Sequence, residues 1–231
     1  MNIESRHVSI WGDSILKGVI LDDTDGRYRV LENNCVKRFA DITGSVIKNN
    51  ASFGMTATKA LERIRRAVGR NPPVVDDLVL IEFGGNDCDF NWPEISADPE
   101  SPHLPKTPID LFGTTLQSIV DLFKGFSIKP ILMALPPLDP ARYFSWISRG
   151  LNAENILGWL GDVNLIYRWQ EAYNEVVTQT AVANDLQFIN IRKSFLVSNN
   201  FSSKLCTDGI HPSEEGQKVI LKSVLDYVEA V

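Results

Sequence analysis

Short β-rich runs alternate along the chain with longer amphipathic stretches, and this alternation limits the fold more than any other feature of the sequence. The sequence predicts strands at residues 7–11, 45–49, 78–83, 129–134 and 187–191. Apolar residues recur at helical spacing between them, at 36–43, 57–68, 112–123 and 166–180, and a last helix is expected from about Ser213. A strand–helix–strand order implies right-handed crossovers and a mostly parallel sheet with helices on both faces.

Specific residues mark the ends of two of these helices. Gly44 follows the stretch 36–43 and predicts its C-terminal end. Thr107 is expected to cap the helix that contains 112–123, with Pro108 in the first turn and Asp110 at the capping-box position. Parallel sheets of this kind bind ligands beyond the carboxyl ends of their strands. The residues directly after each strand are therefore the first candidates for a functional site.

The composition is that of a globular protein and argues against several kinds of partner. Hydrophobic residues make up 44% of the 231 residues and charged residues 23%, close to the average of folded domains. The net charge of −6 argues against nucleic acid or an anionic membrane, because either needs a basic face. The chain starts without the apolar segment of a signal peptide, and its apolar runs are too short for a membrane span, so we expect a cytoplasmic protein.

Cysteine and histidine are few and widely spaced. The three cysteines, Cys35, Cys88 and Cys206, form neither a disulfide framework nor a zinc pattern, and three histidines leave little scope for a metal site. Cys88 and Cys206 are interpreted as buried small hydrophobic residues, which is the usual state of free cysteines. His103 lies in a proline-rich segment and is interpreted as a solvated loop residue.

Two glycine-containing turns follow the first two strands. The run Gly12-Asp13-Ser14 follows the first, where a strand-to-helix turn can present the serine hydroxyl at the edge of the sheet. The backbone N–H of Ser14 would then lie near a helix N-terminus, which favours an anion. Gly54 follows the second strand and, without a Cβ, can bring its N–H close to a ligand. Either turn alone is also compatible with an ordinary strand end.

Two further polar turns follow later strands. In Gly84-Gly85-Asn86-Asp87, the Asn86 amide offers two N–H donors, which suit a developing oxyanion. In the run from Asp208 to Pro212, the aspartate lies three residues before His211. Its carboxylate can accept a hydrogen bond from Nδ1–H and leave Nε2 free to act as a base.

Together the four turns supply every group that acyl transfer requires. Ser14 is the candidate nucleophile, His211 the base and Asp208 the group that orients the base. The backbone N–H groups of Ser14 and Gly54 and the side chain of Asn86 are the candidate oxyanion donors. All four turns are predicted at one edge of the sheet.

This set resembles the SGNH (GDSL) hydrolase family in its order and spacing along nearly the whole chain, with Ile15 where the family often has leucine. The resemblance implies a three-layer α/β/α sandwich, flavodoxin-like in outline, with a central five-stranded parallel sheet. It also implies hydrolysis of small acyl esters through the Ser14–His211–Asp208 triad without metal or organic cofactor. Asp13 and Asp87 are assigned to hydrogen bonding in their turns.

We expect one domain over 1–231, with two segments that are extra relative to the smallest family members. Residues 88–108 hold five prolines and are predicted to form a long irregular loop. Residues 138–164 hold an aromatic cluster: Tyr143, Phe144, Trp146 and Trp159. The cluster is either a lid over an acyl or aryl pocket, with Tyr143, Phe144 and Trp146 binding substrate, or a helical hairpin over an edge of the core. Segments of this length are usually functional or contain helices of their own.

Three classes of function remain open on the sequence alone. A carboxylic ester hydrolase is favoured. A thioesterase, a glycan O-deacetylase or an acyltransferase would use the same triad. A non-catalytic, flavodoxin-like binding domain would require Ser14, Asn86, Asp208 and His211 to be four separate coincidences. The oligomeric state is not predicted.

Overall fold

The centre of the molecule is a five-stranded sheet in which all neighbouring strands are parallel. A computed structural model describes residues 7–74 and 78–230; the segment 1–6, on which the absence of a signal-peptide pattern rests, lies outside the described residues. The strand order is β4-β1-β5-β6-β7. The strands are β1 (His7–Gly12), β4 (Val46–Asn49), β5 (Leu78–Glu82), β6 (Ile131–Met133) and β7 (Phe188–Ile189). The predicted parallel sheet is confirmed.

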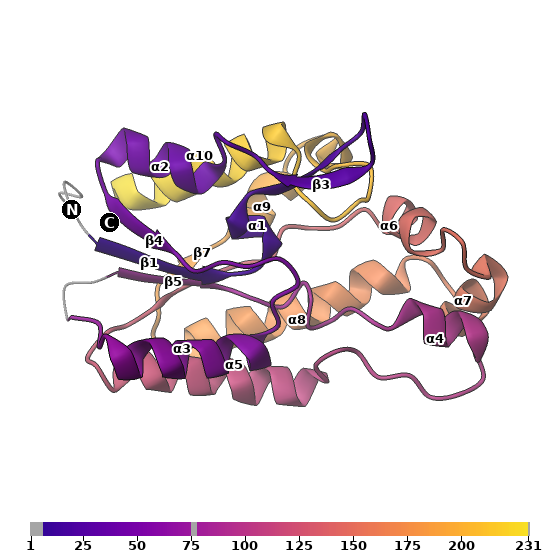
Figure 1. Cartoon of the computed structure of the whole chain (residues 1–231), viewed down its shortest axis with the longest axis horizontal. Helices are drawn as coiled ribbons and strands as arrows, with labels where there is room; N and C mark the ends of the chain where they lie inside the picture. The colour runs from indigo at the N-terminus through magenta and orange to yellow at the C-terminus, as the bar shows by residue number, and fades with distance from the viewer. Residues whose placement is uncertain (1–6, 75–77, 231) are drawn as a thin grey trace.

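Helices cover both faces of this sheet and complete the three predicted layers (Figure 1). One face is covered by α2 (Cys35–Thr43), α9 (Ile191–Leu196) and α10 (Glu214–Ala230). The other face is covered by α3 (Ala57–Arg70), α5 (Ile109–Lys124) and α8 (Leu165–Ala183). Side chains alternate along a strand, so each strand contributes to two cores. Ile10 and Leu80 pack toward α10, whereas Val79 and Ile81 pack toward α3 and α5.

The structure tests the predicted helix ends. Gly44 ends α2 with a φ of 68°, as predicted. The prediction that Thr107 caps α5 is wrong, because the helix begins at Ile109 and Pro108 is its N-cap. Thr107 is held in the preceding loop, where its N–H donates to the Asp87 carbonyl at 3.0 Å and its own carbonyl accepts from Tyr173 Oη at 2.6 Å. These tertiary contacts prevail over the local capping pattern.

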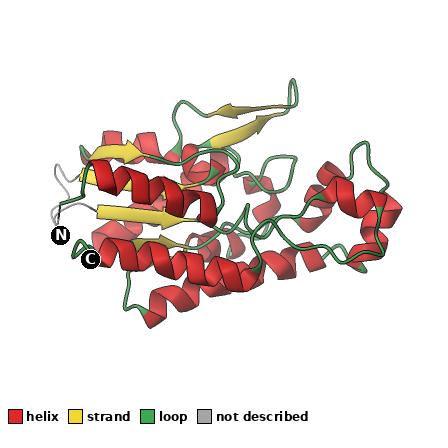
Figure 2. Ribbon diagram, turned by 60° about the horizontal axis from the view of Figure 1, so that its bottom comes forward, coloured by secondary structure: helices red, strands yellow, loops and turns green. Residues whose placement is uncertain are grey.

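The two short strands that follow the Ser14 turn have no counterpart among the predicted elements. The helix α1 (Ser14–Lys17) leads into an antiparallel hairpin of β2 (Val19–Asp22) and β3 (Arg27–Val30). Figure 2 shows the hairpin projecting from the body of the molecule. Gly26, in the turn, has a φ of 68° that favours glycine. The hairpin has a direct role at the site described below.

The two long segments contain helices and build a third apolar cluster beyond the strand ends. Residues 88–108 contain α4 (Trp92–Ala97), and residues 138–164 contain α6 (Pro140–Ile147) and α7 (Ala153–Leu160). Ile95 and Ile156 are both fully buried in this cluster. Figure 1 shows α4, α6 and α7 at the end of the molecule opposite the chain termini. The 3-10 helix η1 (Phe201–Lys204) precedes the Asp208 turn.

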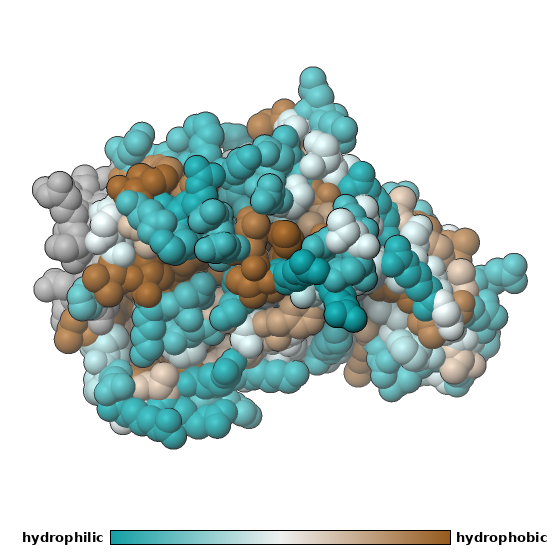
Figure 3. All heavy atoms as spheres, turned by 45° about the horizontal axis from the view of Figure 1, so that its top comes forward, coloured by the Kyte–Doolittle hydropathy of each residue, from teal (hydrophilic) through white to brown (hydrophobic). Residues whose placement is uncertain are grey.

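The outer surface agrees with this arrangement. Hydrophilic side chains cover most of the face seen in Figure 3, and hydrophobic side chains gather in smaller patches between them. Within residues 7–74 and 78–230, no helix combines the length and apolar character that a membrane crossing requires. The division into one domain with two insertions stays a prediction.

Candidate active site

The turn after β1 presents the Ser14 hydroxyl at the carboxyl edge of the sheet. Asp13 caps α1, since its Oδ1 accepts from the Ile15 N–H at 2.9 Å. Gly12 is tightly enclosed, because a Cβ there would lie 3.3 Å from Leu16 Cβ and from Oε2 of Glu82. Ser14 itself is 6% exposed, at the wall of a cavity. Its position is therefore fixed by the cap and by close packing around the turn.

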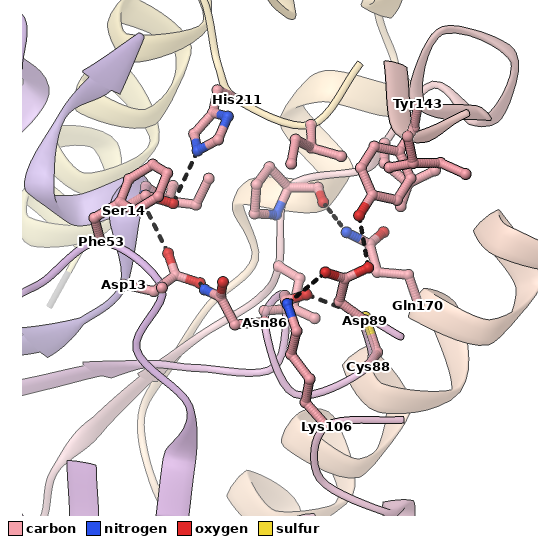
Figure 4. Close-up of a pocket in the computed structure, with 18 of the residues that line it drawn as sticks. Asp13, Ser14, Phe53, Asn86, Cys88, Asp89, Lys106, Tyr143, Gln170 and His211 are labelled. Carbon is pink, nitrogen blue, oxygen red and sulfur yellow. Dashed lines mark hydrogen bonds and ion pairs between the residues drawn. The ribbon is translucent and has the colours of Figure 1, made fainter. Parts of the chain in front are cut away.

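His211 and Asp208 reach Ser14 from the loop before α10. His211 Nε2 lies 3.0 Å from Ser14 Oγ (Figure 4), and His211 Nδ1 lies 2.7 Å from Asp208 Oδ2. Asp208 Oδ1 accepts from the N–H groups of Ile210 at 3.0 Å and of His211 at 3.1 Å. Asp208 is fully buried and His211 nearly so. The structure thus brings together three residues that are up to 197 positions apart.

The Asp208 carboxyl is held in its charged form. Burial acts to raise its pKa, but the hydrogen bond and charge of His211 and two backbone N–H groups hold the pKa below its ordinary value. An ionised Asp208 favours the His211 tautomer with its proton on Nδ1. Nε2 is then the nitrogen that faces the serine.

The predicted oxyanion donors line the same cavity as Ser14. Asn86 follows β5 and donates from Nδ2 to Asp13 Oδ2 at 2.9 Å. Gly54 has a φ of 68°, a conformation that favours glycine. Ser14, Gly54 and Asn86 all border the cavity. Their joint use as an oxyanion hole stays a prediction.

Asp13 and Asp87 accept backbone hydrogen bonds, as expected for acids beside such turns. The donor to Asp87 is distant in sequence, because both of its oxygens accept from Ala57 N–H, at 2.9 and 3.1 Å. Ala57 is the first residue of α3. Asp87 therefore fixes the start of that helix against the loop that carries Asn86.

The buried Asp87 makes a testable contribution to the pH dependence of stability. Burial raises its pKa from 3.8 to about 6, so between these pH values the folded chain binds more protons than the unfolded chain. Stability that is present below pH 4 is therefore lost as the pH rises through 6, by roughly 3 kcal/mol. Urea unfolding of wild type and Asp87→Asn at pH 4 and pH 7 measures this loss of stability. The wild type should lose that much relative to the variant, and parallel curves would contradict the assignment.

Two aromatic rings contact His211 and a third lies against one of them, and all three line the cavity. The ring centroid of Tyr28, in β3, lies 4.9 Å from that of His211. The Phe53 ring stacks on the His211 ring, with a centroid distance of 5.9 Å and an interplanar angle of 7°. Trp146 of α6 lies edge-on to Tyr28 at 6.0 Å. Phe53 is 55% exposed and lines the cavity together with its neighbour Gly54. Tyr28 and Phe53 are functional candidates that the sequence reading missed.

The cavity has a volume of about 310 Å³ and extends from Ser14 to a polar far wall (Figure 4). On that wall, Asp89 accepts hydrogen bonds from Tyr143 Oη at 2.6 Å, Trp92 Nε1 at 2.9 Å and Lys106 Nζ at 2.6 Å. These contacts tie α4 and α6 to the loop of residues 88–108. The polar atoms of this wall are thus largely occupied by one another.

The aromatic residues predicted to bind substrate do not all face the cavity. Tyr143 and Trp146 line it. Phe144 instead packs against the apolar cluster of α4, α6 and α7. Trp159 lies in the same cluster, 5.0 Å from the Phe90 ring. The 138–164 segment is thus a pair of helices over a small core, and one face of α6 borders the cavity.

Three other residues considered in the sequence analysis, Cys88, Cys206 and His103, are buried or half-buried. Burial raises the pKa of the Cys206 thiol to about 11 and that of the Cys88 thiol well above its ordinary value, which keeps both neutral. Both cysteines are buried, as interpreted from the sequence. His103 is half-buried, with Nε2 2.8 Å from the Asp98 carbonyl and its ring edge-on to Trp159.

The fold and the site define a three-layer α/β/α protein with a hydrogen-bonded serine, histidine and aspartate at the carboxyl edge of its sheet. The sequence profile described as "GDSL-like Lipase/Acylhydrolase family" matches residues 10–219, and the chain belongs to this family. The resemblance to the SGNH (GDSL) family is thereby confirmed.

Individual relatives are about one quarter identical to this chain and are longer than it. The GDSL esterase/lipase WDL1 of Oryza sativa subsp. japonica is 25% identical over 176 residues, 75% of this chain and 61% of the rice protein. The isoamyl acetate-hydrolyzing esterase of Saccharomyces cerevisiae is 24% identical over 180 residues, 76% of this chain and 66% of the yeast protein. The alignments thus span less than two thirds of either relative.

Solved structures share the fold. A lipase/acylhydrolase from Enterococcus faecalis superimposes with a TM-score of 0.67 at 20% identity, over 97% of this chain and 96% of that one. A variant of Axe2, an acetyl xylan esterase from Geobacillus stearothermophilus, gives a TM-score of 0.69 at 20% identity, over 99% and 97%. These similarities support the three-layer architecture.

Proposed function

We propose that the protein is a serine hydrolase that cleaves carboxylic esters of small substrates. The observation that carries the proposal is the chain of hydrogen bonds from Asp208 through His211 to Ser14, at 2.7 and 3.0 Å. Its position beside a cavity, at the carboxyl edge of a parallel sheet, is where enzymes of this architecture bind ligands. Membership of the GDSL-like lipase/acylhydrolase family supports the same chemistry.

The geometry suggests the following order of steps. His211 Nε2 takes the proton of Ser14 Oγ as that oxygen attacks the ester carbonyl. Asp208 stabilises the imidazolium that forms. The oxyanion accepts hydrogen bonds from the N–H groups of Ser14 and Gly54 and from the Asn86 amide. His211 then protonates the leaving alcohol, and a water molecule activated by His211 releases the acid.

The position of His211 indicates which side of the cavity receives each half of the ester. The leaving oxygen must lie beside Nε2. The rings of Tyr28 and Phe53 contact the His211 ring, and Trp146 contacts Tyr28. The alcohol portion is therefore proposed to pack on these rings, while the acyl group extends along the cavity toward Tyr143. A volume near 310 Å³ is at the lower end for small-molecule sites, which span roughly 300–1,000 Å³.

A substrate panel tests the proposal and separates the reactions that share this chemistry. The panel contains aryl esters of increasing acyl length, isoamyl acetate, acyl thioesters and acetylated sugars. Isoamyl acetate is included because the yeast relative is named for its hydrolysis. We expect the highest kcat/KM on short acyl esters of alcohols with a bulky apolar group. Turnover of thioesters or sugar acetates alone would assign the triad to one of the alternative reactions.

Trp146→Ala tests the assignment of the alcohol side. Removing one aromatic contact of about 1 kcal/mol should lower kcat/KM for aryl esters roughly fivefold. Methyl esters of the same acid should be unaffected, because their alcohol does not reach the ring. Leu157→Ala, an exposed position on α7, is the matched control. Equal losses on methyl and aryl esters would contradict the assignment.

A further inference from the structure

Another buried acid, Glu82, lies next to Asp13 and takes no part in the proposed steps. It is the last residue of β5, pairs in register with Gly12, and is 1% exposed. Its side chain packs over the turn that carries Ser14, since Oε2 would lie 3.3 Å from a Cβ at Gly12. Within residues 7–74 and 78–230, neither of its carboxyl oxygens has a hydrogen-bond partner. An ionised carboxylate in that state would be very costly.

The groups near Glu82 are other acids. Among the residues that the structure describes, no cation therefore stabilises a negative charge on its carboxyl group. Asp13 and Asp87 are 2% and 0% exposed. None of the ion pairs in the described part of the chain joins a lysine or arginine to any of these three acids. Two neighbouring buried carboxyl groups avoid the repulsion by retaining a proton between them.

The hydrogen bonds around Asp13 and Glu82 decide which of these two carboxyl groups keeps the proton. Asp13 accepts from Ile15 N–H at Oδ1 and from Asn86 Nδ2 at Oδ2, both at 2.9 Å, and such donors favour the charged form. Of the described donors, Glu82 has only the backbone N–H of Asp13 nearby, and this contact does not reach hydrogen-bond geometry. Burial and then the negative charge of Asp13 raise the pKa of Glu82 well above its ordinary value. The two side chains lie close enough for a hydrogen bond once one of them is protonated.

We propose that Glu82 is a protonated positioning residue, whose carboxyl O–H donates to Asp13 and thereby fixes the Asn86 amide for the oxyanion. Asp13 then holds one N–H of that amide and leaves the other free for the substrate oxygen. The same carboxylate caps α1, so one group aligns the turn of Ser14 with the side chain of Asn86. The inference rests on the proposed function, because it assumes that Asn86 binds the oxyanion.

Two substitutions at Glu82 separate the proton from the volume of the side chain. Glu82→Gln keeps an N–H donor toward Asp13 and should retain wild-type kcat at pH 7. Glu82→Met has a similar size but no donor and should lower kcat roughly ten- to a hundredfold with little change in KM, because displaced catalytic groups lose rate steeply. Glu62→Gln, on the exposed side of α3, is the matched control.

The pH profile gives a second readout that a merely structural role would not change. The titratable groups around Glu82 are Asp13, Asp87 and the Cys35 thiol, with His211 acting on Asp13. Wild-type kcat should fall once the pH is high enough to ionise Glu82 beside Asp13, whereas Glu82→Gln should keep its rate there. Coinciding alkaline limbs, or a Glu82→Met variant as active as wild type, would overturn the proposal.

Infrared spectroscopy tests the proton without using turnover. The difference spectrum of wild type minus Glu82→Gln at pH 7 should show the C=O stretch of a protonated carboxyl group. If the stretch of a carboxylate appears instead, the proposal is wrong. A failure of the proposed function would be recognised separately, because a Ser14→Ala variant would then hydrolyse esters as fast as wild type.

Discussion

Ser14→Ala should abolish ester hydrolysis almost completely, lowering kcat for an activated ester by roughly 10⁴- to 10⁶-fold. The hydroxyl that we propose to accept the acyl group is removed, and His211 is left without a partner at 3.0 Å. Binding need not suffer, since the cavity walls and the oxyanion donors remain. Stopped-flow or steady-state release of an aryl alcohol measures the loss.

The variant is expected to fold, so the loss can be read as chemistry. Asp13 caps α1 through Ile15 N–H and does not use the Ser14 side chain. Ser118→Ala on α5, where the hydroxyl donates only to a helix carbonyl, is the matched control and should keep full activity. Wild-type turnover by Ser14→Ala would show that another group is the nucleophile.

Asn86→Ala should lower kcat roughly a hundredfold and leave KM nearly unchanged. A donor that points at the developing oxyanion stabilises the transition state more than the bound ester, so its loss appears in kcat. The variant also deprives Asp13 of the 2.9 Å hydrogen bond from Asn86. Full kinetics on one activated ester separate kcat from KM.

The asparagine prediction is open to a clear contradiction. If only KM rises, Asn86 contacts the ground-state substrate and does not act in the oxyanion hole. Asn33→Ala, at an exposed turn, controls for general effects of removing an asparagine. A fall in kcat with an unchanged KM supports the assigned role.

The sheet and its central residues could be predicted because their signals are local. Each strand is a short apolar run that ends in a polar turn, and parallel strands bring such turns to one edge. Ser14 and Asn86 follow from that rule. The His211 turn is separated from β7 by α9 and η1, and the structure still places all three residues around one cavity. The hairpin of β2 and β3 was missed because β3 is largely exposed and, with two arginines in four residues, offers no apolar run. Tyr28 contacts His211 across 183 positions of the sequence, and no local pattern indicates such a contact.

Predicting other features of the site requires knowing which face of a helix is buried, or which side chains are buried. Tyr143, Trp146 and Ile147 are spaced three and four residues apart and face the cavity, whereas Phe144 is rotated by about 100° from Tyr143. An acid at the end of the apolar strand 78–82 was a visible signal for Glu82. The loss of the Thr107 cap could not be predicted, because it depends on contacts with Asp87 and Tyr173.

Labelling with a fluorophosphonate, followed by mass spectrometry of the proteolytic peptides, tests the central assignment most directly. The reagent phosphonylates a serine only where a base removes its proton and donors bind the oxyanion. The folded protein should acquire one phosphonyl group, on the peptide and at the oxygen of Ser14, and Asp208→Asn should slow the labelling. A natively folded protein that stays unlabelled, or that is labelled at another residue, would contradict the account.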